Sequence, residues 1–333
     1  MWGALCRAVD DVRVGYKITF RRGRVLATRD SRWREWCDPA LLAEPGRFYT
    51  LDGSPPRLSV SAIRRLAWAE FADLEFDSPH RLPFPRANRA RARWFRGRGE
   101  HRPLVLLGHG WAHQGLEAVE RVYVRRLVQG GCDVLLPVLP LHLGRAPEGT
   151  YSGEIMVSGD VALTVDAFRQ AVVEMRALVG WGRERGYRRV GVLGYSLGGV
   201  LAGVLACAEP GLDFTILAGA GGTLASTILD TRLGRNVRKD LAACGMLERA
   251  RLESAWAVIS PGRLRPAVPR RSILILAGRH DRIMLPESVR ALWDAWGKPR
   301  LDWFERGHYT LLALPGAVLR ASLTFIRPDD CAA

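Results

Sequence analysis

The sequence predicts an α/β protein with a doubly wound, mostly parallel sheet of eight strands, a helical cap insertion and an N-terminal extension. From about residue 104 onward, short apolar runs alternate with longer amphipathic stretches, as expected for parallel strands joined by crossover helices. One connection, residues 219–271, is much longer than a plain crossover. Because connections of such a sheet emerge at the carboxyl edge of the strands, where ligands bind, we expect this segment to form the cap.

Apolar runs rich in Val, Ile and Leu predict the parallel strands of the sheet. Two earlier runs are expected to be strands that pair antiparallel at its edge. The predicted parallel strands are Pro103–Gly108, Asp133–Val138, Arg189–Gly194, Asp213–Ala218, Ser272–Ala277 and Arg300–Phe304, and the earlier strands are Leu74–Phe76 and Arg91–Phe95.

Amphipathic periodicity predicts helices between these strands. Residues 1–70 are expected to form the N-terminal extension and residues 71–333 the main domain. Arg64–Phe71, within the extension, also has an amphipathic helical pattern. The predicted helices of the main domain lie near 116–130, 159–185, 197–208, 286–296 and 309–325, with Thr223–Leu229 and Arg235–Gly245 in the cap.

The composition is that of an ordinary globular protein, with 48% hydrophobic and 25% charged residues. Charged residues from Asp10 onward interrupt the N-terminus before a signal-peptide core is complete, and no run of 18 apolar residues follows. We therefore expect a cytoplasmic protein. Its six cysteines are widely scattered without a CxxC pair, which predicts reduced thiols rather than a zinc site or a disulfide framework.

The net charge of +15 comes almost wholly from arginine, because Lys17, Lys239 and Lys298 are the only lysines. Most of this excess lies ahead of residue 104. Such a surface could attract nucleic acid or anionic lipid. An arginine-biased codon usage would give the same composition without any binding function, so contact with nucleic acid or membrane is the secondary hypothesis. The oligomeric state stays open.

The run 194–198, Gly-Tyr-Ser-Leu-Gly, carries the clearest chemical signal. On its own, Gly-x-Ser-x-Gly is also a common small-residue turn. Here the apolar run Val190–Leu193 leads into it and a helix rich in small residues leads away, which is the strand-turn-helix context of a nucleophile elbow. Gly194 and Gly198 allow the helix to pass close to the strand. Ser196 is therefore the predicted nucleophile.

A serine hydroxyl needs a base, and the base needs a carboxylate to orient it. His308 follows the last predicted strand, where the chain order serine, acid, histidine places the base, whereas His280 lies earlier. Asp281 lies just past the preceding strand, at the carboxyl edge. Asp302 is the rival acid, but it lies inside the final strand. We therefore predict His308 as base and Asp281 as acid.

Two backbone N–H groups are expected to form an oxyanion hole. One is that of Leu197, at the start of the helix after Ser196. The other is that of Trp111, because Gly110 lets the loop after the first parallel strand turn towards the site. His109 is expected to brace this loop through hydrogen bonds.

Further polar and aromatic residues near the predicted strand ends could contact a substrate. For several of them, a solvated loop or simple packing of the cap onto the core explains the residue equally well or better. No metal-binding spacing and no P-loop is present in the sequence, so neither a metal nor a cofactor is expected. The substrate-binding candidates are His109, Gly110, His113, Tyr195, His142, Arg145 and Trp256.

Four short motifs occur in the order and at the strand ends typical of one family: His109-Gly110, the 194–199 run, Gly278–Asp281 and Gly307-His308. Through them the chain resembles the α/β-hydrolase superfamily across about residues 74–327. The resemblance implies a triad of Ser196, His308 and Asp281 that acts through an acyl-enzyme hydrolysed by water. Within the superfamily the chain is similar to dienelactone-hydrolase-like esterases. Through Pro140–Arg145 it is also similar to domain-containing-protein-18-like esterases.

The resemblance implies a carboxylic-ester hydrolase acting on a small-molecule ester, with residues 71–333 as the hydrolase domain. An acyltransferase or an amidase would use the same acyl-enzyme with a different acceptor or substrate bond. A protein that uses the fold as a scaffold and binds nucleic acid or a membrane through its basic N-terminus is the non-catalytic alternative.

Overall fold

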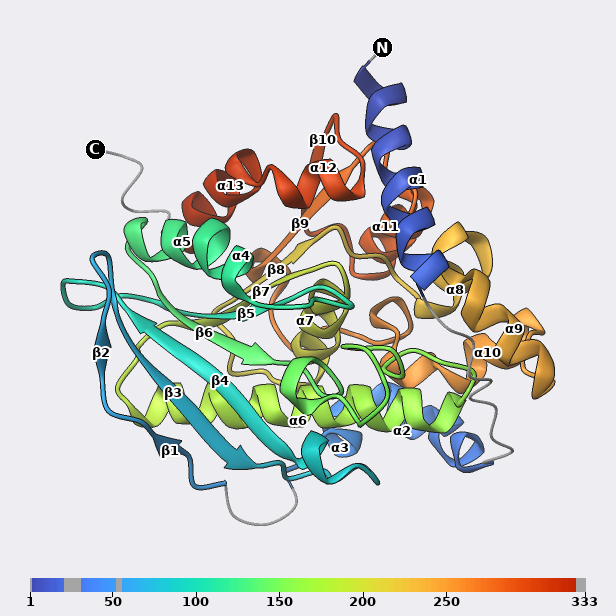
Figure 1. Cartoon of the computed structure of the whole chain (residues 1–333), viewed down its shortest axis with the longest axis horizontal. Helices are drawn as coiled ribbons and strands as arrows, with labels where there is room; N and C mark the ends of the chain where they lie inside the picture. The colour runs from blue at the N-terminus through green and yellow to red at the C-terminus, as the bar shows by residue number, and fades with distance from the viewer. Residues whose placement is uncertain (1, 21–30, 52–55, 328–333) are drawn as a thin grey trace.

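A single mixed sheet runs through the molecule in the computed structural model, which describes residues 2–20, 31–51 and 56–327 (Figure 1). Within these residues the sheet has ten strands in the order β1-β3-β4-β6-β5-β7-β8-β9-β10, with β2 paired to β3. The strands are β1 Ser59–Val60, β2 Arg64–Arg65, β3 Glu70–Asp77, β4 Arg89–Arg96, β5 Leu104–Gly108, β6 Asp133–Val138, β7 Val190–Tyr195, β8 Phe214–Ala218, β9 Ile273–Gly278 and β10 Arg300–Phe304.

The strand order confirms the predicted sheet. Strands β6, β5, β7, β8, β9 and β10 are parallel, and β1, β2, β3 and β4 add antiparallel pairs at one side. All eight predicted strands are present, and the two additional ones, β1 and β2, are only two residues long. The chain moves from β5 to β6 on one side and then back to β7 on the other. The carboxyl ends of β5 and β7 are therefore neighbours, with Gly108 opposite Gly194.

The helix predicted for residues 64–71 is wrong. Arg64 and Arg65 form β2, and the chain turns back through Leu66, whose N–H donates to the carbonyl of Ala69, into β3. Phe71 stacks on Phe95 of β4, with ring centroids 5.8 Å apart, and Arg64 lies over the Phe71 ring. Cross-strand aromatic packing thus overrides the local helical pattern, because it buries surface that an isolated helix would leave exposed.

Helices cover both faces of the sheet and confirm most of the predicted segments. The predicted helix 309–325 is instead two helices, because Pro315 removes a backbone donor and interrupts the helix between them. The helices are α1 Trp2–Phe20, α2 Pro39–Ala43, α3 Pro45–Phe48, α4 Glu117–Val119, a π-helical turn Glu120–Val124, α5 Arg125–Gln129, α6 Val161–Glu184, α7 Leu197–Ala208, α8 Leu224–Asp230, α9 Arg235–Ala243, α10 Arg249–Ala255, α11 Pro286–Ala295, α12 His308–Ala313 and α13 Gly316–Ile326.

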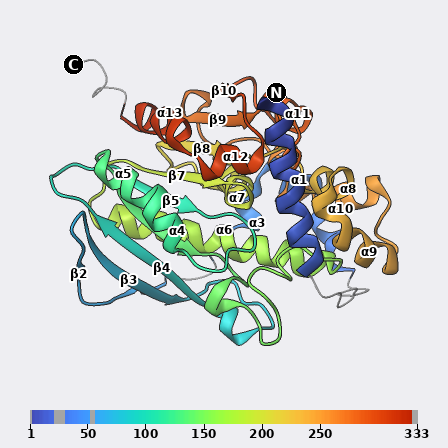
Figure 2. The same ribbon diagram turned by 45° about the horizontal axis from the view of Figure 1, so that its top comes forward.

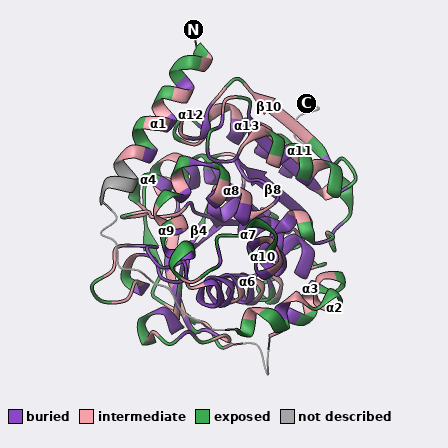
Figure 3. Cartoon of the chain, turned by 90° about the vertical axis from the view of Figure 1, so that its right-hand side faces the viewer, coloured by how far each residue is buried: buried purple, intermediate pink, exposed green. Residues whose placement is uncertain are grey.

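Alternating side chains of β5 show how the two layers are separated. Leu104 and Leu106 belong to the core on the face covered by α6 and α7, whereas Val105 and Leu107 belong to the core beneath α5 and α13. Burial is deepest along α6 and α7, most of whose residues are buried (Figure 3). Within the described residues, none of the helices combines the length and apolar character needed to cross a membrane.

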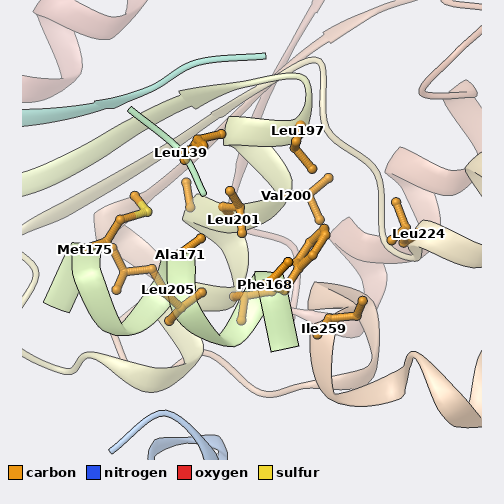
Figure 4. Close-up of a cluster of buried hydrophobic side chains, with 14 of the residues drawn as sticks. Leu139, Phe168, Ala171, Met175, Leu197, Val200, Leu201, Leu205, Leu224 and Ile259 are labelled. Atoms are coloured by element: carbon orange, nitrogen blue, oxygen red, sulfur yellow. The ribbon is translucent and has the colours of Figure 1, made fainter. Parts of the chain in front are cut away.

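The interface between α6 and α7 supports the turn that precedes α7. Phe168 and Ala171 of α6 lie against Leu201 and Leu205 of α7 in a fully apolar cluster (Figure 4). Leu197, the first residue of α7, belongs to the same cluster. The position of the turn before α7 is therefore coupled to the packing of the core.

A buried ion pair joins α6 to the loop after β6. Both guanidinium Nη atoms of Arg145 donate to the carboxylate of Glu174, at 2.7 and 2.6 Å, and the two side chains are 1% and 6% exposed. Arg145 also donates to the carbonyls of Val138 and Ala87. A buried guanidinium whose donors are satisfied in this way fixes the loop rigidly on the sheet edge.

Glu174→Ala is expected to lower the free energy of unfolding by about 3–5 kcal/mol, because it leaves Arg145 charged and buried without its carboxylate. The matched control is Glu148→Ala, which removes the partner of Arg86 in an exposed pair whose side chains are 81% and 59% exposed. Glu148→Ala should lower the free energy of unfolding by less than about 1 kcal/mol. Urea unfolding of both variants measures the difference, and equal effects would contradict a structural role for the buried pair.

Candidate active site

Ser196 lies on the sharp turn between β7 and α7. Its backbone has φ 55° and ψ −124°, a conformation that non-glycine residues rarely adopt. The Ser196 N–H donates to the carbonyl of Ala218 at 2.9 Å, and its own carbonyl accepts from the N–H of Gly199 at 2.9 Å. Such a conformation costs on the order of 1–3 kcal/mol and persists only where surrounding contacts impose it. These backbone bonds hold the serine above the carboxyl edge of the sheet.

Close backbone approach explains the glycines on either side of Ser196. A Cβ atom at Gly194 would collide with the carbonyl oxygen of Gly198, and one at Gly198 would collide with the carbonyl oxygen of Gly108. Neither contact is with a flexible side chain, so neither can be relieved cheaply. The first turn of α7 therefore packs directly on the ends of β7 and β5; the contact with β7 is the one that the sequence predicted.

His308 and Asp281, from two later loops, form one hydrogen-bonded chain with Ser196. His308 Nε2 lies 2.9 Å from Ser196 Oγ, and His308 Nδ1 lies 2.8 Å from Asp281 Oδ2. Because a carboxylate accepts, Nδ1 carries the proton and Nε2 is left to accept from the serine hydroxyl. His308 and Asp281 are each 3% exposed, so water competes little for these bonds.

The loop after β9 holds Asp281 in place. Its Oδ1 atom accepts the backbone N–H groups of Ile283 and Met284, both at 2.8 Å, which leaves Oδ2 for the histidine. The rival acid, Asp302, lies within β10 and pairs with Arg300 at 2.9 Å. The rival histidine, His280, pairs with Glu305 at 3.0 Å. Of these candidates, His308 is the one that contacts Ser196, and Asp281 is the one that contacts His308.

His109, also one of the substrate-binding candidates, braces the loop after β5. Its Nε2 accepts the N–H of Leu139 at 3.1 Å, so its Nδ1 carries a proton and donates to the carbonyl of Gly110 at 2.8 Å. Burial lowers the pKa of His109 well below its ordinary value, and neighbouring His142 lowers it further. A neutral ring with both nitrogens bound to backbone has a positioning role in this loop.

Three other substrate-binding candidates are also buried among protein atoms. His142 is inaccessible, donates from Nδ1 to the carbonyl of Pro140 at 2.8 Å and accepts the N–H of Ala112 at 3.3 Å. Arg145 is held in the ion pair with Glu174 described above. Trp256 is 0% exposed and belongs to the main apolar core beneath α10. These protein contacts do not favour a substrate contact for the three side chains, because sequence position does not tell whether a side chain turns inwards.

The remaining candidates lie on the loop after β5 and on the residue before Ser196. A Cβ atom at Gly110 would lie 3.4 Å from the Cβ of Ser196, so this loop runs directly past the serine. The Trp111 indole donates to the carbonyl of Gly153 at 2.6 Å, which anchors the same loop. The Tyr195 hydroxyl lies 3.0 Å from His113 Nε2, and the Tyr195 ring stacks on that of Tyr123. Burial raises the pKa of Tyr195, so its hydroxyl stays neutral.

The two predicted oxyanion donors, the N–H groups of Leu197 and Trp111, lie on the segments next to Ser196 and Gly110. Leu197 is the first residue of α7, and backbone N–H groups in the first turn of a helix lack an acceptor within the helix. Trp111 follows Gly110 directly. Their role in binding an oxyanion stays a prediction. In the described residues, no group of three or more His, Cys, Asp or Glu side chains is arranged to hold a metal ion.

Asp10 of α1 lies against the site, although the sequence did not point to it. This fully buried carboxylate accepts the N–H of His308 at 2.8 Å, although the two residues are 298 positions apart. A local signal was available, since Cys6, Asp10 and Val14 recur every four residues and all three are buried on one face of α1. An acidic residue within an apolar helical stripe indicates a specific partner, but the sequence does not show which.

Comparison with known families and proteins gives two kinds of match. Residues 82–217, from the segment before β4 through β8, match the family described as "Alpha/beta hydrolase domain containing 18". The uncharacterized protein Rv2627c of Mycobacterium tuberculosis is 30% identical over an alignment of 292 residues that covers 80% of this chain and 66% of the relative. This chain thus spans slightly less than two thirds of that relative. The uncharacterized protein YdjC of Bacillus subtilis is 25% identical over 104 residues, 31% of this chain and 89% of that protein.

Solved structures share the fold over most of the chain. Acetyl xylan esterase 1 from Thermoanaerobacterium sp. JW/SL YS485 superposes with a TM-score of 0.62 at 17% identity, covering 90% of this chain and 96% of the esterase. The acetyl xylan esterase of Paenibacillus sp. R4 superposes with a TM-score of 0.60 at 14% identity, covering 89% of this chain and 95% of that esterase. At these identities the likeness concerns the fold.

Gly198→Ala is expected to lower the free energy of unfolding by about 1–3 kcal/mol, because the new methyl group meets the backbone of Gly108. Gly180→Ala is the control. Gly180 is exposed within α6, and an added Cβ there would meet no atom within 4 Å. The higher helix propensity of alanine should therefore raise the free energy of unfolding by about 0.5–1 kcal/mol. Chemical denaturation measures both. A Gly198→Ala variant as stable as the native chain would refute the close approach of α7 to β5.

Proposed function

We propose that the chain is a serine hydrolase of the α/β-hydrolase superfamily that cleaves a carboxylic ester through an acyl-enzyme on Ser196. The family match over residues 82–217 and the fold shared with the two acetyl xylan esterases support this proposal. The observation that supports this best is the continuous chain of hydrogen bonds from Asp281 through His308 to Ser196. These residues come from three separate loops and meet at distances suited to proton transfer. The esterase neighbours in the comparison are consistent with a small-molecule ester as substrate.

In this mechanism His308 Nε2 takes the proton of Ser196 Oγ as the oxygen attacks the ester carbonyl. The same nitrogen then gives the proton to the leaving alcohol, and an acyl group remains on Ser196. A water molecule, deprotonated by His308, attacks the acyl-enzyme, and His308 returns the proton to Ser196 Oγ as the acid is released. Asp281 keeps Nδ1 protonated and stabilises the imidazolium, and its bonds to Ile283 and Met284 prevent it from turning away.

The N–H groups of Leu197 and Trp111 are proposed to bind the negatively charged oxygen of the tetrahedral intermediates. Each such donor contributes on the order of 3 kcal/mol to stabilising the transition state. The indole bond from Trp111 to Gly153 supports this role, because it fixes the loop that carries the second donor. Gly110 is the proposed substrate-binding residue with the most direct support, since a Cβ atom there would lie 3.4 Å from the Cβ of Ser196. Tyr195 and His113, whose side chains bond each other, are proposed to form the wall behind it.

The segment 219–271, which carries α8, α9 and α10, is proposed to act as the cap that shapes the substrate site, and residues 1–70 remain an extension to the hydrolase domain. This segment follows β8, whose last residue, Ala218, accepts the N–H of Ser196. The cap therefore begins directly beside the nucleophile. An acyltransferase or amidase activity would need the same groups, and product analysis with alcohol and amine acceptors distinguishes the three reactions.

The contacts of the arginines near the edge of the sheet favour the hydrolase over the nucleic-acid hypothesis. Arg64 and Arg93 pair with Asp73, and Arg89 and Arg91 pair with Glu75. Part of the basic N-terminal surplus is thus compensated locally, which weakens the field available to attract a polyanion. Binding of nucleic acid or a membrane surface stays a prediction.

A fluorophosphonate probe is expected to label the native protein on Ser196, because the reagent reacts with serines activated by a neighbouring base. Ser196→Ala should remove the labelling without changing the circular dichroism spectrum. Peptide mapping after labelling identifies the modified residue. A folded native protein that stays unlabelled would overturn the proposed function.

Asp281→Asn is expected to lower kcat for a p-nitrophenyl ester by about 10⁴-fold, because asparagine favours the wrong imidazole tautomer. Asp302→Asn carries the same change on the rival acid and should leave kcat within about two-fold, since Asp302 bonds Arg300 rather than His308. Steady-state kinetics with a series of ester chain lengths measures both variants and also defines the acyl preference. Equal losses in the two variants would argue against Asp281 as the acid.

A further inference from the structure

Helix α1, at the start of the chain, packs over the two loops that carry Asp281 and His308. Figures 1 and 2 both show α1 running beside α12. The indole of Trp2 donates to the carbonyl of Glu305 at 2.6 Å, and Arg7 Nη1 lies 3.2 Å from His280 Nδ1. The helix therefore contacts the acid loop and the histidine loop along its length.

The carboxylate of Asp10 is the centre of this contact. Its Oδ2 accepts the N–H groups of His308 at 2.8 Å and Arg282 at 3.2 Å, and its Oδ1 accepts that of Tyr309 at 2.9 Å. Arg282 directly follows Asp281 in the chain. One buried side chain thus joins the backbone next to the predicted acid to the backbone of the predicted base.

Gly307 makes this approach possible. It precedes α12 and has no side chain with which to bind the free N–H groups at the start of that helix. A Cβ atom at Gly307 would lie 2.7 Å from Asp10 Oδ2 and 2.9 Å from the carbonyl oxygen of Cys6. The glycine at 307 leaves the space that α1 fills, and Asp10 supplies the acceptor that a capping residue would otherwise provide.

Burial raises the pKa of Asp10, and the bonds from Tyr309 and His308 oppose that rise. The charge of Asp281 raises the pKa further, and that of His308 lowers it. The ionised form suits the site, because a protonated carboxyl would turn one acceptor into a donor facing backbone N–H groups. All three N–H groups that Asp10 accepts belong to the two loops. The carboxylate therefore fixes these loops and does more than fill space in the core.

We propose that Asp10 is a positioning residue of the active site, holding the acid loop and the histidine loop in the register in which Asp281, His308 and Ser196 are hydrogen-bonded. The proposal rests on the proposed function for its kinetic consequences, but its geometric consequence does not depend on turnover. It makes α1 part of the catalytic unit, although α1 lies at the opposite end of the chain from His308.

Asp10→Asn is the decisive variant. Asparagine keeps the shape of the side chain, but its amide group replaces one acceptor with a donor facing backbone N–H groups. A displacement of about 1 Å in a catalytic group can cost about 10²-fold in rate. We expect kcat for a p-nitrophenyl ester to fall by about 10- to 100-fold with KM nearly unchanged, because the substrate contacts are not altered.

Two controls on the same helix separate positioning from general stability. Val14→Ala removes buried packing one turn after Asp10, where Val14 is 3% exposed, and should lower Tm while leaving kcat within about two-fold. Asp11→Asn removes the same charge from the neighbouring residue, which forms partly exposed pairs with Arg232 and Arg282, and should also keep its kcat. If Val14→Ala loses as much kcat as Asp10→Asn, the effect is loss of stability and the proposal is wrong.

Gly307→Ala is a second way to displace the Asp10 carboxylate from the backbone N–H groups of the histidine loop. Its backbone has φ −88°, so alanine is acceptable there apart from the contact with Asp10 and Cys6. We expect it to lower kcat in the same way as Asp10→Asn, and the losses in the double variant to be less than multiplicative, because both changes break one interaction. Fully multiplicative losses would contradict the proposal.

Proton NMR tests the geometry without turnover. The native chain should show the low-field resonance of the His308 Nδ1–H bonded to Asp281, and this resonance should persist in Val14→Ala and Asp11→Asn but disappear or broaden in Asp10→Asn. A native protein with the resonance but without hydrolysis would refute the proposed function and leave the positioning role supported. An Asp10→Asn protein that keeps both the resonance and kcat would overturn the inference.

Discussion

The close backbone approach at the end of β7 is the constraint on which the rest of the site depends. Gly194 and Gly198 have no room for a Cβ atom, and one at Gly108 would lie 3.1 Å from the carbonyl oxygen of Gly198, so α7 packs directly on two strand ends. This packing forces Ser196 into a backbone conformation with positive φ. The apolar contacts of α7 with α6 stabilise the arrangement, because displacing the turn would open a cavity in the main core. The position of the serine is therefore set by packing far beneath it.

The loops around the serine depend on buried polar groups rather than on apolar packing. His109 and His142 each use both ring nitrogens to bind backbone groups, and Arg145 is bonded to Glu174 and to backbone carbonyls. Irregular loops leave backbone groups without partners in regular structure, and buried side chains with several donors or acceptors satisfy them. These side chains therefore hold the loops in place instead of facing a substrate.

Most of the fold could be predicted from the sequence because strand and helix patterns are local. All eight predicted strands are present, and Ser196 could be assigned as a candidate from the residues on each side of it. The residues at 64–71 were assigned wrongly because Phe71 is stabilised by Phe95, about two dozen positions later, rather than by its neighbours in sequence. The inward direction of His142 and Arg145 could not be predicted either, since it depends on which carbonyls lie nearby after folding.

The sequence by itself determined where the eight main strands lie along the chain, the strand-turn-helix context of Ser196 and the loops on which an acid and a base would follow it. These features rest on residue size, apolar periodicity and chain order, which are readable along the chain. Only the tertiary structure decided that Asp281 bonds His308, that His308 bonds Ser196, and that Asp10 joins the acid and histidine loops. The physical reason is that a buried hydrogen bond requires two groups within about 3 Å, and folding alone brings residues 298 positions apart to that distance.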